Sequence, residues 1–333
     1  MLCFRAFTAA SEKFSFTSTT SVSETTGSEK PSPPKIPMNC WTNSCISTVP
    51  FITHHTYQSV TSPRIVSGFE SRDIVRISQG SHNRDRDNVI EERSLSISVS
   101  TPDYGSNNLG VTMRTSGNDD LLAIGMLYSE GIIKSIRDVE SINSEVDSIH
   151  FSLRDSSSFN PEIHCRGSTV TSACGICGRS TIDDVLHMHV PDLQEGFGVS
   201  IELLSKCLGT MKPNQPFFAN TGGSHACASF SEDGQIGMIF EDVGRHNAMD
   251  KLVGFYVNND SIPLSDMILV VSGRASFELV QKSIRAGFPV MASIGAPSTM
   301  AIDLAREYGK TLICFAKSDS ATVYSGHRRF SNF

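Results

Sequence analysis

The chain has 333 residues, enough for one large domain or two ordinary ones. Its formal net charge is −7 at pH 7, and this balance argues against binding to nucleic acid or to an anionic membrane surface. Because no run of about 18 apolar residues occurs, we expect no segment that spans a bilayer. The nine cysteines are an odd number at irregular spacing, which favours a reducing compartment over a disulfide framework.

The first 85 residues differ in composition from the rest of the chain. They are rich in Ser, Thr and Pro and show little periodic hydrophobicity, so they cannot bury enough apolar surface to offset chain entropy. We expect a disordered tail over residues 1–85 and a folded domain over residues 86–333. The first 22 residues are typical of an organelle transit peptide and equally of a tail without a targeting role. We expect a cytoplasmic protein, with organelle import as the alternative.

The N-terminal half of the folded domain, residues 86–200, begins with a strand pattern. Apolar residues alternate with serines over residues 95–99, which predicts a half-buried strand, and residues 111–115 are its expected partner. Leucines and isoleucines recur on one side of residues 118–128, which predicts a helix. A further strand is expected over residues 149–153.

Two cysteines follow in a glycine-rich loop, where residues 174–178 read CGICG. Ser180 resembles the first residue of a capping box, and the helix start expected there would favour a thiolate over a thiol. Four interpretations of the pair stay open: a redox dithiol, a zinc site, a glycine-rich turn with inert thiols, and a sulfur carrier. A zinc site needs two more ligands, and the nearest candidates, His187 and His189, match no zinc-finger spacing.

The C-terminal half, residues 201–333, carries the clearest pattern of secondary structure. A short amphipathic helix is expected at 200–208, a hairpin at 226–240 and a helix that starts within 241–251. Apolar strands and amphipathic helices then alternate, at 267–271, 276–286, 289–294, 298–308 and 311–316. This alternation predicts a βαβαβ unit with a parallel sheet and right-handed crossovers, and hence an α/β fold.

The ends of these strands indicate where a ligand binds. In open α/β sheets a ligand lies beyond the carboxyl ends of the strands, where helix N-termini offer free N–H groups to a phosphate. Arg274 follows the first strand and adds a bidentate donor. The sequence therefore predicts a site for a phosphorylated or nucleotide-bearing molecule, although the loops could also be plain connectors. His225 and His246 lie in polar loops, where they orient phosphates, tune the thiols or satisfy buried backbone groups.

Two known signatures are missing, and several polar residues have a structural interpretation. Neither a P-loop nor a Gly-x-Gly-x-x-Gly motif occurs, so ordinary use of ATP or NAD is not indicated. Asp242 and Asp250 are expected to brace Arg245 and Lys251. The remaining cysteines of the apolar runs, at 227 and 314, are expected to pack in the core.

Several stretches together resemble the FdhD family, the formate dehydrogenase accessory sulfurtransferases. The resemblance covers roughly residues 87–330 and leaves the N-terminal tail outside. The stretches that carry it are VTMRT at 111–115, SEGII at 129–133, CGICG at 174–178, TGGSH at 221–225, EDVGRHNA at 241–248 and SGRASFE at 272–278. So many motifs in the same order are jointly specific.

The resemblance implies both a fold and an activity. It implies a cytidine deaminase-like α/β/α sandwich, usually as a homodimer. Such proteins accept sulfur as a persulfide from a cysteine desulfurase and pass it to the molybdenum cofactor, a bis-molybdopterin guanine dinucleotide, before that cofactor enters formate dehydrogenase. By position, Cys174 matches the persulfide-carrying cysteine and Cys177 its companion. No metal of the protein's own, no nucleic acid and no membrane is implied.

The family's cofactor-binding stretch falls near the C-terminus, and there this chain departs from the usual pattern. By position it comprises Phe315, Ala316, Lys317, Ser318, Asp319 and Ser320. An Arg- and Gly-containing loop is usual, whereas Lys is a point charge without a planar fork, and an aspartate repels phosphate. A molybdenum-cofactor-binding chaperone that moves no sulfur is the alternative function.

Overall fold

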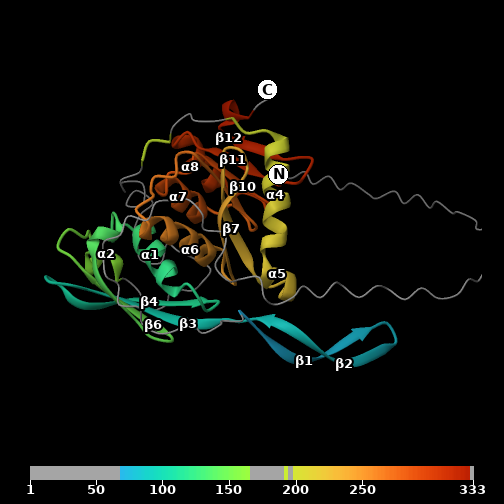
Figure 1. The fold of residues 1–333 in the computed structure, drawn as a ribbon, viewed down its shortest axis with the longest axis horizontal. Helices are drawn as coiled ribbons and strands as arrows, with labels where there is room; N and C mark the ends of the chain where they lie inside the picture. Colours follow the sequence, from blue (N-terminus) through green and yellow to red (C-terminus); the bar gives the residue numbers. More distant parts are fainter. Residues whose placement is uncertain (1–67, 166–190, 194–197, 331–333) are drawn as a thin grey trace, which may run out of the picture. The chain divides into compact units, whose positions relative to one another are not determined.

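The structure is a computed structural model that describes residues 68–165, 191–193 and 198–330. The predicted tail up to residue 67 and the predicted sulfur-carrying loop with Cys174 and Cys177 lie outside the described residues. Within the described part, the strands form a two-stranded, a four-stranded and a six-stranded sheet (Figure 1).

The two-stranded sheet is a long hairpin. Strand β1 (Phe69–Ser78) pairs antiparallel with β2 (Ser81–Ile90) through a two-residue turn at Gln79 and Gly80. The prediction that the folded domain begins at residue 86 is therefore wrong at this boundary, because residues 69–85 form most of this hairpin. Charged and polar side chains make up most of both strands, so no hydrophobic period marked them in the sequence.

The four-stranded sheet has one buried face and the order β4-β3-β6-β5. Its strands are β3 (Arg93–Thr101), β4 (Gly105–Arg114), β5 (Val139–Ser144) and β6 (Ser148–Leu153). The predicted alternation is confirmed, because Leu95, Ile97 and Val99 are buried while the serines between them lie on the other face. Strand β5 was not predicted, and most of its residues are exposed.

Two helices join this sheet to the C-terminal half. Helix α1 (Asp119–Ser129) packs closely against α6 (Arg245–Asn258). Gly125 of α1 lies against the carbonyl of Asp250, and Gly254 of α6 lies against the carbonyl of Leu121, with no room for a Cβ at either glycine. Glycine is needed at both positions because the two backbones are in direct contact.

The six-stranded sheet is the centre of the C-terminal half and has the order β12-β11-β10-β9-β7-β8. Strands β9, β10 and β11 are parallel, as predicted, and the others pair antiparallel. The strands are β7 (His225–Ser231), β8 (Ile236–Asp242), β9 (Met267–Val271), β10 (Val290–Ser293), β11 (Thr311–Cys314) and β12 (Thr322–Ser325). Helices α7 (Phe277–Arg285) and α8 (Thr299–Glu307) form the two crossovers.

Helices cover both faces of this sheet (Figure 1). Leu269 and Val271 of β9 face a core shared with α6, α7 and α8, whereas Ile268 and Val270 face a second core that includes residues of α4 (Ile201–Met211). The predicted α/β class is confirmed; likeness to cytidine deaminase stays a prediction. The shorter elements are η1 (Ile136–Asp138), α2 (Pro161–His164), η2 (Lys212–Asn214), α5 (Pro216–Thr221) and η3 (His327–Arg329).

Candidate functional site

The carboxyl ends of the parallel strands lie together at one edge of the six-stranded sheet. Backbone hydrogen bonds hold the loops there: Gly295 N–H donates to the carbonyl of Gly273 at 3.1 Å, and Phe315 N–H donates to the carbonyl of Gly295 at 3.2 Å. The structure thus brings the Arg274 loop and the 315–320 stretch to the same edge. We call this the loop edge, formed by residues 222–225, 242–246, 272–276, 294–298 and 315–320.

Gly295 sits at the middle of the loop edge in a crowded position. A Cβ at this residue would lie 2.8 Å from both the Arg274 Cα and the Gly273 carbonyl oxygen. Real Cβ atoms do not approach backbone atoms that closely, so a side chain here would push the β9 and β10 loops apart. The close spacing of the two loops therefore depends on glycine.

Antiparallel strands add further groups to the loop edge. His225, at the start of β7, pairs with Asp242 at the end of β8. Cys227, two residues further along β7, pairs with Val271 at the end of β9. His225 consequently lies beside the Arg274 loop, with its Nδ1 3.5 Å from the Ser272 Oγ. A Cβ placed on Gly273 would lie 3.4 Å from both the His225 Nδ1 and the Arg245 Cδ.

These groups give the loop edge a positive character. The pKa of His225 is lowered, first by its burial and then by the charges of Arg245, His246 and Arg274. His225 is therefore a neutral hydrogen-bonding group near pH 7 that lies beside the guanidinium groups of Arg245 and Arg274. An anion with several negative oxygens fits this combination of fixed cations and a neutral imidazole.

Arg245 is the residue of the loop edge that sequence reasoning missed. The sequence suggested that an aspartate braces it, but Asp242 pairs with Lys251 at 2.7 Å and Asp250 pairs with Lys282 at 2.6 Å. The Nε of Arg245 is buried and has no hydrogen-bond partner among the described residues. A buried donor without a partner is costly, and an anionic ligand at the loop edge would supply one.

Helix N-termini add to the field at the loop edge. Ser276 caps α7 and Ser298 caps α8, each by accepting a hydrogen bond from the backbone three residues on. Helix α6 begins after Gly244 and has no side-chain cap. Three helices therefore direct the positive ends of their dipoles toward this edge. The N–H groups in the first turns of these helices are suited to binding phosphate oxygens.

The 315–320 stretch presents an aromatic ring and polar groups at the end of β11. Phe315 has a φ of 52° and is 44% exposed although it is a large apolar residue. The Lys317 N–H donates to the Ser320 carbonyl at 2.8 Å, which closes a turn whose side chains are exposed. An exposed ring at the edge of a cationic patch is suited to stacking on a planar heterocycle.

A buried polar network supports the loop edge from behind. The Asp242 carboxylate accepts hydrogen bonds from the backbone of Thr115 at 3.1 Å and of Gly244 at 2.9 Å, and from the Asn247 side chain at 2.9 Å. His246 and Glu278 form a second buried pair, with the Nε2 and Oε2 atoms 2.8 Å apart. These contacts fix the first turn of α6 relative to the strand ends, and with it Arg245.

The described cysteines do not form a reactive site. Cys227 and Cys314 are fully buried, which confirms their predicted place in the core. Burial raises the pKa of Cys207 to about 11 and that of Cys314 to about 12. The predicted sulfur carriers lie outside the described residues, as do the histidines considered as zinc ligands, so the proposed roles of Cys174 and Cys177 stay predictions.

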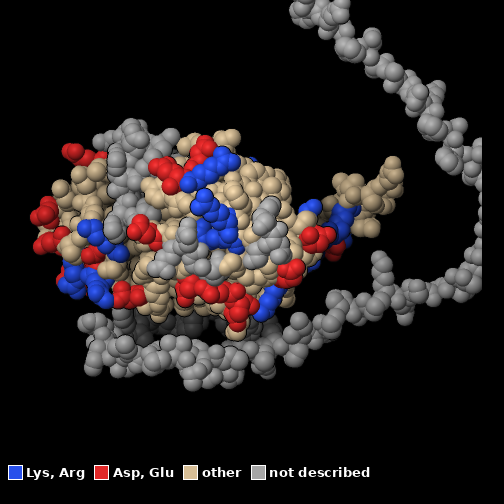
Figure 2. Space-filling model, turned by 90° about the horizontal axis from the view of Figure 1, so that it is seen from above, with Lys and Arg blue, Asp and Glu red and all other residues tan. Residues whose placement is uncertain are grey.

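The described residues also bear on metals and membranes. They contain no group of three or more His, Cys, Asp or Glu that could hold a metal ion. None of the helices in this part of the chain is long and apolar enough to cross a membrane. Figure 2 shows one face of the molecule, where basic and acidic side chains lie in small separate groups of both signs.

Comparisons with known proteins agree with the sequence motifs. The model of the FdhD/NarQ family matches residues 90–331. The sulfur carrier protein FdhD of Streptomyces coelicolor is 39% identical over 276 residues, which cover 78% of this chain and 95% of that protein. The protein of the same name from Sulfolobus acidocaldarius is 37% identical over 257 residues, covering 77% of this chain and 96% of the relative.

A solved structure has the same fold. It is the crystal structure of a protein from Desulfotalea psychrophila described as a formate dehydrogenase accessory protein, with a TM-score of 0.62 and 19% sequence identity. The match covers 79% of this chain and 99% of that one. On the family match and the level of identity to these relatives, the chain belongs to the FdhD/NarQ family.

Proposed function

We propose that this protein is a sulfur carrier for formate dehydrogenase. It accepts a sulfur atom on Cys174 from a cysteine desulfurase and transfers it to the molybdenum cofactor, a bis-molybdopterin guanine dinucleotide. Cys177 is the companion thiol. The names of the relatives, which are sulfur carrier proteins at up to 39% identity, support the sulfur-carrying part of this proposal. The cationic loop edge supports the cofactor-binding part.

The loading step is a balanced thiol exchange. The Cys174 thiolate attacks the terminal sulfur of the desulfurase persulfide, a new S–S bond forms on Cys174, and the desulfurase cysteine leaves as a thiolate. No electrons are gained or lost overall, so neither an oxidant nor a metal is needed. The delivery step breaks the S–S bond of Cys174 and bonds the terminal sulfur to the cofactor, which is the substrate and supplies the two electrons that convert sulfane sulfur to sulfide; Cys174 leaves as a thiolate.

The observation that carries the cofactor-binding part is the buried Arg245 Nε without a partner in the described chain. It lies at an edge with Arg274 and three helix N-termini, which together suit the phosphates of a dinucleotide. Phe315 would stack on a planar ring of the same ligand. Lys317 offers a single point charge, and Asp319 repels phosphate, so we expect phosphate contacts to depend on the two arginines rather than on the 317–320 turn.

The proposal includes partners. Formate dehydrogenase is the recipient of the cofactor, a cysteine desulfurase is the sulfur donor, and the chain acts as a homodimer in the cytoplasm or in an organelle. The relatives' names and the described accessory role of the Desulfotalea protein support the link to formate dehydrogenase.

Persulfide trapping tests the sulfur transfer. The full chain is incubated with a cysteine desulfurase and cysteine, alkylated, digested and analysed by mass spectrometry. We expect one added sulfur atom on the peptide with Cys174, no addition in Cys174→Ala, and normal loading in Cys165→Ala as the matched control. Loading that is absent from the wild type, together with tight cofactor binding, would favour the alternative, a chaperone that binds the cofactor without moving sulfur.

Nucleotide binding tests the loop edge separately. GDP carries the guanine and the diphosphate of the proposed ligand, and its affinity can be measured by calorimetry. We expect Arg245→Gln and Arg274→Gln each to weaken GDP binding by about 10-fold or more, since a charge-assisted hydrogen bond contributes roughly 1.5–3 kcal/mol. Arg72→Gln, in the hairpin of β1 and β2, is the control. Unchanged affinity in both loop-edge variants would rule out this site.

A further inference from the structure

The turn after β11 carries a cation and an anion two residues apart at the loop edge. Residues 315–321 join the antiparallel strands β11 and β12. The Lys317 N–H donates to the Ser320 carbonyl at 2.8 Å, which closes a tight turn with Asp319 near its tip. The side chains of Lys317 and Asp319 are both exposed. The turn therefore offers a hydrogen-bond donor and a hydrogen-bond acceptor to a ligand at this edge.

The Asp319 carboxylate pairs with no cation of the described chain, although the loop edge is rich in cations. Its Oδ1 accepts a hydrogen bond from the Ser320 hydroxyl at 3.0 Å. Among the described residues, neither Lys317 nor Asp319 forms an ion pair. The capacity of both side chains for further hydrogen bonds is thus directed to the solvent or to a ligand.

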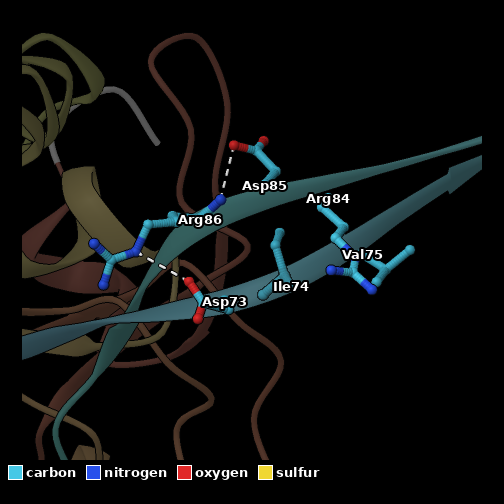
Figure 3. A pocket seen from close by; sticks show the side chains of 6 residues that line it. All are labelled: Asp73, Ile74, Val75, Arg84, Asp85 and Arg86. Atoms are coloured by element: carbon cyan, nitrogen blue, oxygen red, sulfur yellow. Dashed lines mark hydrogen bonds and ion pairs between the residues drawn. The ribbon is translucent and has the colours of Figure 1, made fainter.

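Several exposed aspartates elsewhere in the described chain do take a cation. In the hairpin of β1 and β2, Arg86 lies 3.2 Å from Asp73, and Arg76 lies 2.8 Å from Asp85. Figure 3 shows Asp73 and Arg86 directed toward each other at the hollow that they help to line. The charge of Asp73 is therefore matched within the protein, whereas that of Asp319 is not.

An aromatic ring lies at the root of the same turn. The backbone of Phe315 is tied to the loop after β10, because its N–H donates to the Gly295 carbonyl at 3.2 Å. Its ring lies beside that of Tyr324, with the ring centroids 6.5 Å apart. A planar heterocycle stacked on Phe315 would present an edge to the side chains of Lys317 and Asp319.

The distance from this ring to the loop-edge arginines suits one nucleotide. Strands β9, β10 and β11 are neighbours in the sheet, so the loops that follow β9 and β11 lie about two strand spacings, or about 10 Å, apart. Arg274 belongs to the first of these loops and Phe315 to the second. A ribose with its diphosphate covers such a span, so a base stacked on Phe315 leaves the phosphates beside the arginines.

The two charges of the turn match one kind of heterocycle edge. Guanine and pterin share an edge on which a carbonyl oxygen stands beside a ring N–H and an amino group. An ammonium donates to the oxygen, and a carboxylate, which only accepts, takes the two N–H groups. Adenine reverses this order, because its amino group would face the ammonium and its ring nitrogen would face the carboxylate. The turn therefore suits guanine or pterin and disfavours adenine.

We propose that Asp319 determines which heterocycle binds at the loop edge, by accepting hydrogen bonds from the ring N–H and the amino group of guanine or pterin. Lys317 donates to the neighbouring carbonyl oxygen, and Phe315 carries the ring. This inference rests on the cofactor site of the proposed function and assigns the recognition of its heterocycle. It also accounts for an acidic residue at an edge that binds phosphates, since the carboxylate lies at the end of the ligand away from them.

Calorimetry with nucleoside diphosphates tests this selection, because the base changes while the diphosphate stays the same. For the full wild-type chain we expect GDP to bind about 10-fold more tightly than ADP, since each base-specific pair of hydrogen bonds discriminates by at least that order. Inosine diphosphate lacks the amino group and should bind with intermediate affinity. Equal affinities for the three compounds would overturn the inference.

Asp319→Asn should change the preferred base. The amide oxygen still accepts the ring N–H, but the amide nitrogen donates, so the variant matches xanthine, which has an oxygen in place of the amino group. We expect GDP to bind about 10-fold more weakly and xanthosine diphosphate to become the preferred ligand. Asp73→Asn is the matched control, because it removes an exposed aspartate in the hairpin and should keep the wild-type order of affinities.

A pterin ligand distinguishes the two sources of the shared edge. The probe is 6-hydroxymethylpterin diphosphate. If Asp319→Asn weakens its binding and leaves GDP unchanged, the turn holds the pterin; if the variant weakens GDP, the turn holds the guanine. An Asp319→Asn protein that binds every diphosphate more tightly by the same factor would show that the carboxylate only repels phosphate. That result, or an unchanged order of affinities in the variant, would overturn the inference.

The arginine variants separate this inference from the proposed function. GDP binding that is insensitive to Arg245→Gln and Arg274→Gln would remove the loop-edge site and the role of Asp319 with it. A site that needs both arginines but does not distinguish the bases would remove the role of Asp319 alone. Because Asp319 is exposed, the urea midpoint of Asp319→Asn should equal that of the wild type, so a change in affinity reports on the ligand contact.

Discussion

The Lys251 ammonium lies 2.7 Å from the Asp242 carboxylate, and both side chains are almost completely buried. Lys251 also donates to the backbone carbonyl of Thr115 at 2.9 Å, so the pair ties α6 to the end of β8 and to the loop between β4 and α1. Because Asp242 takes Lys251 as its partner, Arg245 is left to face the loop edge. The buried pair thus determines which cation of this segment is available to a ligand.

Asp242→Asn should strongly destabilise the fold. The substitution keeps the size of the side chain but leaves the Lys251 charge buried without a counter-charge, which typically costs about 3–5 kcal/mol. The urea midpoint of the full chain measures the change in the free energy of unfolding. Glu70→Gln is the control, because its ion pair with Arg72 is exposed and should contribute at most about 1 kcal/mol. Equal effects of the two substitutions would contradict this account.

The sequence predicted the parallel core well because burial on both faces leaves a continuous apolar run in each strand. Residues 267–271 and 311–316 were predicted as strands on that pattern, and the structure has strands at Met267–Val271 and Thr311–Cys314. The rule that ligands bind beyond strand ends then located the edge with Arg274. Strand β12, with exposed or half-buried residues at three of its four positions, left no such pattern.

The hairpin of β1 and β2 and the role of Arg245 could not be predicted, for two different physical reasons. The hairpin is held by backbone pairing and by short ion pairs across two polar strands, and neither gives a hydrophobic period. Arg245 and Lys251 are both near Asp242 in the sequence, and spacing alone cannot say which of them the carboxylate binds. That choice depends on how α6 enters the core, with Lys251 inside and Arg245 at the loop edge.

Native thiol reactivity should separate Cys207 and Cys314 from the carrier cysteines. Burial raises the pKa of Cys207 to about 11, so at pH 8 only about one molecule in a thousand carries the thiolate, which is the reactive form. Cys314, with a pKa raised to about 12, should react more slowly still. Brief alkylation of the folded chain at pH 8, followed by peptide mass spectrometry, should label Cys174 and Cys177 before Cys207 and Cys314.

The control for this labelling is the unfolded chain, in which every cysteine should react at a similar rate. Labelling of Cys207 in the folded protein as fast as Cys174 would argue against the assignment of the accessible thiol.

Gly295→Ala should disturb the loop edge while the core stays folded. The new Cβ would lie 2.8 Å from the Arg274 Cα and from the Gly273 carbonyl, so the β9 and β10 loops must separate. We expect a destabilisation of about 1–3 kcal/mol and a loss of GDP affinity of the kind expected for Arg274→Gln. Gly209→Ala is the matched control, since a Cβ there meets no atom within 4 Å and a helical alanine is favoured by about 0.5–1 kcal/mol. GDP affinity that is unaffected by Gly295→Ala would show that the spacing of these loops is unimportant for the ligand.

Lys310→Met should stabilise the protein at neutral pH, and the gain should shrink as the pH rises. Lys310 is fully buried at the start of β11 and donates to the carbonyl of Phe288, and burial lowers its pKa well below 10.5. Between the folded pKa and 10.5 the unfolded chain binds the proton and the folded chain does not, so the penalty of burying this lysine falls as the pH increases toward 10.5. An apolar residue of similar size removes the penalty, and we expect a gain in the free energy of unfolding of about 1–3 kcal/mol at pH 7.

Urea midpoints of the wild type and the Lys310→Met variant, measured from pH 7 to pH 10, should converge. The exposed Lys212→Met should follow the wild type at every pH. A Lys310→Met protein that is less stable at pH 7, or a difference that stays constant with pH, would show that the lysine keeps its proton in the folded state.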